Sequence, residues 1–317
     1  MLFKRIIIGT LLLVLTACGQ TGGTLTGTED VAKPVYVVKI DDTAAAHPQI
    51  GINQADVVYI EQVEGGLTRL AAIFSSKLPP EIGPVRSARI SDIELLAQYG
   101  KVAFLYSGAQ TKFRPVLRSA NLIDLSAEHE SPKLYPRKPG RIAPVDMIIN
   151  TEELIRITDE RKLDIAKSKN MGWKFGKRDK AQGEPVISAL IKWPAAKYQV
   201  NWNSKGWAIS QNNSPEFDAD GKIVAPKTFV IQKVLITDSE YSDKFGGVTP
   251  FSASVGEGDA WVLRDGFAIK GRWSRASESE GTKWLDEAGK EIKFATGQVW
   301  IALTDQTPVF VAPETKK

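Results

Sequence analysis

Three arginines close to tight turns are the residues of this sequence best suited to chemistry. Arg69 follows a Gly-Gly pair, and Arg86 and Arg89 follow a Gly-Pro pair. If a helix opens at about Ser87, Arg86 and Arg89 share one face of its first turn. If the neighbouring strands pair, Arg69 lies near the same turn. Guanidinium groups bind phosphate and carboxylate groups bidentately, so these arginines predict an anion-binding site.

Acidic residues in the same part of the chain offer a second interpretation. Asp56, Glu61 and Glu64 lie just before Arg69 along the sequence. Three neighbouring arginines repel one another, so these acids would serve as their partners if no anion does. In that case the cluster is a structural salt-bridge network that positions the turn. The sequence leaves both interpretations open.

Other catalytic arrangements find little support. Ser87 with His47 or His129 would complete a Ser-His-Asp triad, but the spacing does not resemble a nucleophile elbow. There is no phosphate-binding Walker loop and no dinucleotide fingerprint. We therefore expect no nucleotide cofactor and assign no catalytic residue.

Metal chemistry is equally poorly supported. Two histidines and one cysteine are too few for a zinc site built from those side chains. A hard-cation site on acids of the N-terminal half stays open, although no calcium-loop spacing is present. We expect neither a metal nor a cofactor. The acids concerned are Asp41, Asp42 and Asp56.

The composition is that of an ordinary globular protein. The chain has 317 residues, of which 43% are hydrophobic and 25% charged. This length suggests about two domains. The formal net charge of +4 is too small to indicate a nucleic-acid partner, and a single cysteine excludes an internal disulfide.

The first residues have the pattern of a secretory signal. Lys4 and Arg5 precede an apolar run that is too short to span a bilayer comfortably, and Leu-Thr-Ala-Cys18 resembles the bacterial lipobox. We predict a signal peptide over 1–17 and a lipid on Cys18. The alternative is a plain signal peptide with an accidental cysteine. Lipidation would place the protein on the cell membrane, facing the extracytoplasmic side.

Two domains with different patterns should follow a flexible Gly- and Thr-rich tether over 18–33. Residues 34–165 interleave apolar strand candidates with helical spacing, which predicts an α/β or α+β N-terminal domain. Residues 193–317 show short strands separated by Gly, Asn, Asp and Pro, which predicts a mainly β C-terminal domain, a small barrel or sandwich. All eight tryptophans lie at or after Trp173, and core packing is the commoner fate of each.

Within these domains the strand candidates are 35–40, 55–60, 67–75, 102–106, 198–202, 207–210, 228–237, 260–264, 267–273, 299–304 and 309–312. A helix is expected over 91–99, and another begins at Thr151 as its N-cap. Between the domains, residues 166–192 are rich in Lys and Arg. We interpret them as a basic linker, either solvated or attracted to anionic lipid or wall polymer.

Three stretches of the N-terminal half resemble the signature of the DUF3048 family of YerB-like bacterial lipoproteins. They span 49–59, 63–69 and 82–89, the last reading Ile-Gly-Pro-Val-Arg-Ser-Ala-Arg. The C-terminal half resembles the family's second domain at 265–266, 271–273 and 297–301. The resemblance implies a two-domain lipoprotein of unassigned function, with no known catalytic residues to carry over. Where members often have Pro-His-Asn, this chain has Pro-Val-Asp at 144–146, which weakens an enzymatic interpretation.

Two functions follow from these observations. The first is a tethered module that binds a cell-envelope polymer or an envelope protein without catalysis. The second is a phosphoryl or glycosyl-phosphate transferase that clamps an anionic envelope precursor with Arg69, Arg86 and Arg89. The order of a Thr-Arg pair, a strand and an arginine-rich turn also loosely resembles the LytR-CpsA-Psr phosphotransferases of wall-polymer attachment. Such an analogy of layout is a weak argument for function.

Overall fold

The computed structural model describes residues 25–28, 31–243 and 246–314. Cys18 and the signal segment lie outside these residues. Within the described ranges, no helix is long and apolar enough to cross a membrane.

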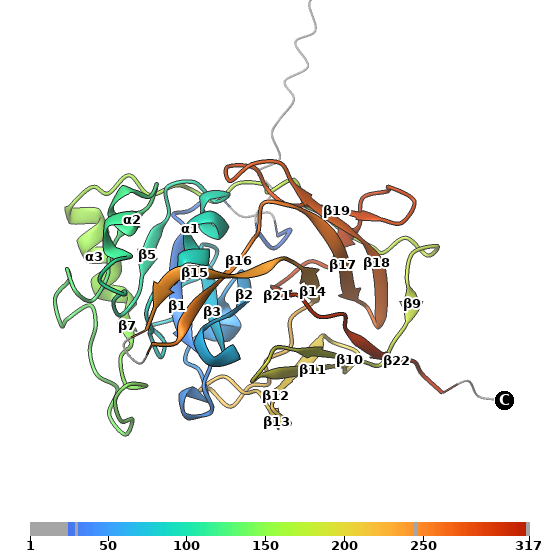
Figure 1. Cartoon of the computed structure of the whole chain (residues 1–317), viewed down its shortest axis with the longest axis horizontal. Coiled ribbons are helices and arrows are strands. Elements are labelled where there is room, and N and C mark those ends of the chain that lie inside the picture. Colours follow the sequence, from blue (N-terminus) through green and yellow to red (C-terminus); the bar gives the residue numbers. More distant parts are fainter. Residues whose placement is uncertain (1–24, 29–30, 244–245, 315–317) are drawn as a thin grey trace, which may run out of the picture.

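One large sheet runs through the molecule and positions everything else (Figure 1). The short strand β9 (Glu184–Pro185) pairs with β18 outside the main path. In spatial order the main path is β19 (Lys283–Asp286), β18 (Phe267–Arg275), β17 (Gly256–Arg264), β14 (Thr228–Lys233), β21 (Val299–Thr304), β2 (Val57–Gln62), β3 (Thr68–Phe74), β1 (Tyr36–Asp41), β5 (Ala103–Leu105) and β6 (Ile123–Asp124).

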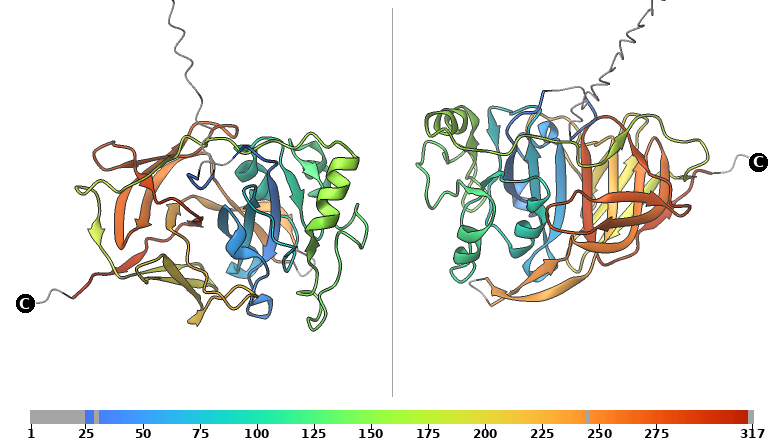
Figure 2. Two further views of the ribbon diagram at one scale, coloured as in Figure 1. Left: turned by 180° about the vertical axis from the view of Figure 1, so that it is seen from behind. Right: turned by 90° about the horizontal axis from the view of Figure 1, so that it is seen from above.

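The N-terminal and C-terminal strands meet within this sheet. β2 pairs in parallel with β21, with Val57 opposite Val299 and Ile60 opposite Ala302. Both strands are apolar on both faces, and such strands belong in the centre of a sheet where each face is covered. The two halves therefore share one sheet, and in Figure 2 they stand side by side.

A second sheet covers the C-terminal half of the first. Trp207 from this sheet and Phe229 and Trp300 from the large sheet lie in one apolar cluster, so the two sheets pack as a sandwich. The C-terminal region is mainly β, as predicted, and seven of the eight tryptophans are buried. The second sheet runs in the order β13 (Ser214–Pro215), β12 (Trp207–Gln211), β11 (Lys197–Trp202), β10 (Ser188–Lys192) and β22 (Val309–Val311).

Helices cover both faces of the N-terminal half. α1 (Ile90–Ala97) buries Leu95 and Leu96 on one face, in a cluster with Val37 and Tyr59. α3 (Thr151–Glu160) buries Leu154 and Ile157 on the other face. Alternate residues of β1 to β3 enter these two clusters, as strand geometry requires.

Short elements complete the described fold. α2 (Arg114–Ser119) lies beyond β5, and β15 (Ile236–Ser242) and β16 (Val248–Ser252) form a hairpin that contacts α1. Two further short pairs are β4 (Glu81–Ile82) with β7 (Ile149–Asn150), and β8 (Lys174–Phe175) with β20 (Lys293–Phe294). Single 3-10 turns span Ala44–Ala46, Ile52–Gln54 and Glu64–Gly66.

Two local expectations need correction. Asn150, not Thr151, caps α3: its Oδ1 accepts hydrogen bonds from the amides of Glu152 and Glu153, at 3.1 and 3.3 Å. The Thr151 hydroxyl instead donates to the carbonyl of Pro79, at 2.6 Å. The single strand expected over 228–237 is two strands, β14 and the start of β15, which belong to different sheets.

The segments expected to be a tether and a linker are partly folded. Leu25 is only 2% exposed and packs in the same core cluster as Trp173, which is itself buried. Gln182 and Val186 are buried, and β10 begins at Ser188 inside the second sheet. Several of the few apolar residues in these polar stretches are buried in the core, among them Leu25, Trp173 and Val186, whereas Val31 and Ile187 are exposed.

Candidate functional site

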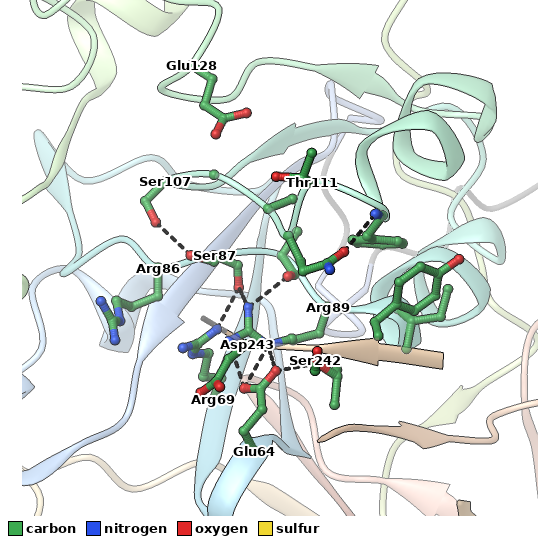
Figure 3. Close-up of a pocket in the computed structure, with 18 residues that line it drawn as sticks. Glu64, Arg69, Arg86, Ser87, Arg89, Ser107, Thr111, Glu128, Ser242 and Asp243 are labelled. Carbon is green, nitrogen blue, oxygen red and sulfur yellow. Dashed lines mark hydrogen bonds and ion pairs between the residues drawn. The ribbon is translucent and has the colours of Figure 1, made fainter. Parts of the chain in front are cut away.

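A cavity of about 590 Å³ lies where β1 ends and β3 begins, and all three arginines line it (Figure 3). The turn before α1 forms one wall, residues 107–113 form another, and the β15–β16 hairpin closes the third side. Figure 3 shows Glu64 and Glu128 at opposite sides. We call this cavity the arginine pocket. Its lining includes Glu64, Arg69, Arg86, Ser87, Arg89, Ser107, Phe113, Glu128, Tyr241, Asp243 and Thr249.

The turn that carries Arg86 and Arg89 is extended rather than helical. The Arg86 amide donates to the Lys39 carbonyl at 2.8 Å, and its own carbonyl accepts from the Ser107 amide at 2.9 Å. The turn thus lies between the end of β1 and the residues after β5, and it is hydrogen-bonded to both. α1 begins only at Ile90, with Arg89 as its N-cap. The expected placement of Arg86 and Arg89 on one helical face is therefore wrong, although both still line the pocket.

Arg69 is the most deeply placed cation of the pocket, and no acidic side chain among the described residues pairs with it. It is 8% exposed, and its Nη1 donates a single hydrogen bond, to the Ser87 carbonyl at 3.0 Å. No described carboxylate lies within 4 Å of its guanidinium. Burial, together with the positive charges of Arg89 and Arg86, lowers the pKa of Arg69 to about 9. This group would gain most from an anion.

Arg86 and Arg89 each have one acidic partner. Arg86 Nε lies 2.7 Å from Asp41 Oδ2. Arg89 Nε and Nη2 both donate to Glu64 Oε2, at 2.9 and 2.7 Å. Burial acts to raise the pKa of Glu64, but the Arg89 guanidinium outweighs it and leaves that pKa below its ordinary value.

Of the three acids proposed as partners, only Glu64 contacts an arginine of the pocket. Asp56 Oδ2 accepts the amides of Ser75 and Ser76, at 2.7 and 2.8 Å, so this carboxylate shapes the turn after β3. Glu61 is bound to Lys39, and the acid that holds Arg86 is Asp41 instead. The sequence alone does not show which basic residue each of these acids will contact, because that depends on how the strands pair.

The Glu61 carboxylate belongs to a separate, fully buried ionic cluster. Lys39 Nζ lies 2.6 Å from Glu61 Oε1 and 2.7 Å from Asp92 Oδ1, and all three side chains are fully buried. Burial, and next the negative charge of Asp92, raise the pKa of Glu61 above its ordinary value. We call these three residues the lysine cluster.

Neither histidine contacts Ser87. His129 is beside Asp124 at 3.2 Å. His47 sits between the carboxylates of Asp42 and Glu216. Burial acts to lower the pKa of His47, but these two carboxylates raise it to about 10. The Ser87 hydroxyl meets only the hydroxyl of Ser107, at 3.3 Å, so the triad interpretation is wrong.

The Asp42–His47–Glu216 arrangement was not predicted, because Glu216 is distant in sequence and comes from the C-terminal half. Tyr198 from the second sheet also donates to Asp42, at 2.6 Å, and so ties the two halves together. Within the described part of the chain, no three Asp, Glu, His or Cys side chains are grouped to hold a metal ion.

The C-terminal wall of the arginine pocket was also missed. Tyr241 and Thr249 come from the β15–β16 hairpin, more than 150 residues after Arg89. The Thr249 hydroxyl donates to Glu64 and so joins this hairpin to the Arg89 pair. No local pattern announces a contact between residues so far apart.

Comparisons with known proteins agree with this architecture. A model for the DUF3048 N-terminal domain, described as a protein of unknown function, matches residues 21–164, and one for the DUF3048 C-terminal domain matches 189–301. The crystal structure of the YerB protein from Bacillus subtilis superposes with a TM-score of 0.76, over 91% of this chain and 99% of that one. At 19% identity, this likeness shows the fold alone.

A curated relative adds a short sequence match. It is the Bacillus subtilis (strain 168) protein described as "Putative lipoprotein YerB", which is 47% identical over 57 residues. These residues are 18% of this chain and 17% of that protein. Since the two domain models together span most of the sequence, the chain belongs to the DUF3048 family.

Proposed function

We propose that this protein is a lipoprotein, anchored through Cys18 to the extracytoplasmic side of the cell membrane, that binds an anionic group of a cell-envelope polymer in the arginine pocket. The lipobox and the name of the Bacillus subtilis relative support the anchor. The single observation that carries the binding role is Arg69, a buried guanidinium with one hydrogen bond and no described acidic partner beside an open cavity.

The chemistry of the pocket favours phosphate or carboxylate. A guanidinium carries five N–H donors, and Arg69 uses one of them within the protein. An anion that accepts from the others would also reduce the mutual repulsion of Arg69, Arg86 and Arg89. The ligand thus takes the place of a carboxylate that the described part of the chain does not bring to Arg69.

Binding fits the pocket better than group transfer. A transferase would need a free carboxylate or a similar base to activate its acceptor. Glu64, Glu128 and Asp243 line the cavity. Glu64 is held by Arg89, Glu128 by Arg114, and Asp243 Oδ1 accepts a hydrogen bond from the Gly247 amide at 2.8 Å. Each would have to give up a contact to act as a base.

Arg69→Gln tests the binding role directly. Titration of the protein with a soluble poly(glycerol phosphate) should give binding that weakens tenfold or more in this variant, because a hydrogen bond to a charged group contributes about 1.5–3 kcal/mol. Arg156→Gln is the matched control, since Arg156 pairs with Glu153 and Glu160 on the surface of α3.

Equal affinity of the wild-type protein and the Arg69→Gln variant would contradict the proposal. Retention of an acidic envelope protein but not of the polymer would reassign the partner while keeping the pocket. Turnover of a phosphodiester substrate that disappears in the Arg69→Gln variant would instead support the transferase.

A further inference from the structure

A second, strongly basic cavity lies away from the arginine pocket. It has a volume of about 640 Å³ and is open to solvent. Five basic side chains line it and only one acidic side chain, Asp265, does so. We call this surface the basic end. Its cations are Lys177, Arg178, Lys205, Lys227 and Arg264.

Most of this charge is not neutralised within the fold. Arg264 pairs with Asp265 at 2.6 Å, but among the described residues no carboxylate lies within 4 Å of the other four cations. Arg178 Nη1 donates to the Asp179 carbonyl at 2.9 Å, and its guanidinium lies over the ring of Phe267. Lys177, Lys205 and Lys227 are exposed. The basic end therefore presents net positive charge to solvent.

The N-terminal segment enters the fold at this surface. The Thr26 carbonyl accepts a hydrogen bond from the Gly297 amide at 2.9 Å. Gly297 in turn lies against the methylenes of Lys227, where a Cβ would come within 2.5 Å of Lys227 Cγ. Gly27 packs against Phe175, where a Cβ would come within 2.5 Å of the Phe175 side chain, and Phe175 precedes the cavity residue Gly176. The chain thus leaves the domain beside the lysines of the basic end.

Strand register places the basic end and the arginine pocket at opposite ends of the sheet. Arg264, Thr228, Val299 and Val57 lie in one row across β17, β14, β21 and β2, at the end that carries the basic cavity. Arg69 lies at the other end of β3, opposite Asp41 and Glu61. Val57 and Glu61 are four residues apart on β2, which separates the two rows by roughly 13 Å along the strands.

The chain length between Cys18 and Leu25 brings the basic end close to a membrane. Seven residues reach at most about 25 Å when fully extended. We propose that the basic end docks on anionic phospholipid headgroups and so directs the arginine pocket away from the bilayer. This inference rests on the proposed lipid anchor at Cys18, which supplies the membrane. It commits to a lipid surface because the anchored segment and the cations share one face.

Vesicle binding tests the docking surface without the lipid anchor. The secreted chain bearing Cys18→Ser should cosediment with vesicles containing 30% phosphatidylglycerol, and weakly or not at all with neutral phosphatidylcholine vesicles. Each lysine near an anionic surface contributes about fivefold in partitioning, so Lys205→Gln with Lys227→Gln should lower binding about 25-fold. Because Lys227 packs on Gly297, the pair Lys177→Gln and Lys205→Gln offers a second test that leaves this contact intact.

The control removes the same charge from the opposite end. Lys112 and Lys192 are exposed, near the arginine pocket and near the end of β21. Lys112→Gln with Lys192→Gln should leave vesicle binding unchanged. Equal binding to neutral and anionic vesicles, or equal losses in control and test pairs, would overturn the inference.

The anchor is measured separately, by fractionation of cells that express Cys18→Ser. If this variant stays in the membrane fraction in high salt, the lipid anchor fails. The vesicle result then still decides whether the basic end binds anionic lipid. If high salt releases this variant but not the wild-type protein, the anchor and the electrostatic contact both operate, which is the expected result.

Discussion

The arginine pocket and the lysine cluster lie at the same end of the same sheet face, yet their buried cations differ in pairing and in access to solvent. In the lysine cluster, one cation is enclosed by two carboxylates and no side chain reaches solvent. In the pocket, Arg69 keeps a single hydrogen bond to a carbonyl beside an open cavity. The types of residue are similar, so pairing and access to solvent separate a structural charge from a binding charge.

The comparison also shows why the two groups lie so close together. Lys39 and Asp41 alternate with apolar residues on β1, and both point to the α1 side of the sheet. Lys39 lies deep enough for Asp92 of α1 to cover it, whereas Asp41 lies at the strand end, where it meets Arg86. Depth along one strand therefore decides which charges are sealed and which reach a ligand.

Lys39→Met should give the largest effect, because it strands two buried carboxylates. Removal of one partner from a buried ion pair costs about 3–5 kcal/mol. Urea unfolding followed by circular dichroism measures the loss. Lys101→Met is the matched control, since Lys101 is exposed and has no described ionic partner.

A rescue variant separates charge from packing in this cluster. Adding Glu61→Gln and Asp92→Asn to Lys39→Met removes the stranded charges and should recover part of the lost stability. A loss below about 1 kcal/mol in the single variant would mean that the lysine cluster does not hold the sheet and α1 together.

Arg89→Gln should have an intermediate effect. It removes two hydrogen bonds to Glu64, and bonds to a charged group contribute about 1.5–3 kcal/mol. Because the folded-state pKa of Glu64 lies below its ordinary value of 4.5, this stability is present above pH 4.5 and lost as pH falls through the lower, folded-state pKa.

The pH dependence supplies the control for this variant. Unfolding measured between pH 3 and pH 7 should show a smaller acid-induced loss in Arg89→Gln than in the wild-type protein. An identical acid profile would show that the Arg89–Glu64 pair carries no net stabilisation.

Local pattern was sufficient to predict most of the fold. The strands around Val37, Val58 and Ala71 were expected because each is a short, nearly continuous apolar run, and the helix around Leu95 because its apolar residues have helical spacing. The pairing of β2 with β21 was not expected, since nothing in two apolar runs 242 residues apart indicates that they pair.

The candidate site was foreseen only in part. The residue type of the three arginines and the turns beside them predicted a common site, and the pocket does bring them together. Their partners were mostly misjudged: Asp56 turns toward Ser75, and Glu61 toward Lys39. Sequence proximity suggested these acids, but strand alternation and depth decide which face and which end a side chain reaches.

Arg69→Gln should give the smallest change in stability and so sharpen the comparison most. The substitution removes one hydrogen bond to a carbonyl. It also removes a charge whose pKa is lowered by burial and by repulsion from Arg89 and Arg86. We expect a change below about 1 kcal/mol in ligand-free protein, against several for Lys39→Met. Urea unfolding is then repeated with poly(glycerol phosphate) at a hundred times its dissociation constant. The ligand should raise the free energy of unfolding of the wild-type protein by about 2.7 kcal/mol, and that of the variant by less. A large loss without ligand would place Arg69 with Lys39 as a structural charge, and equal stabilisation by ligand would remove it from the site.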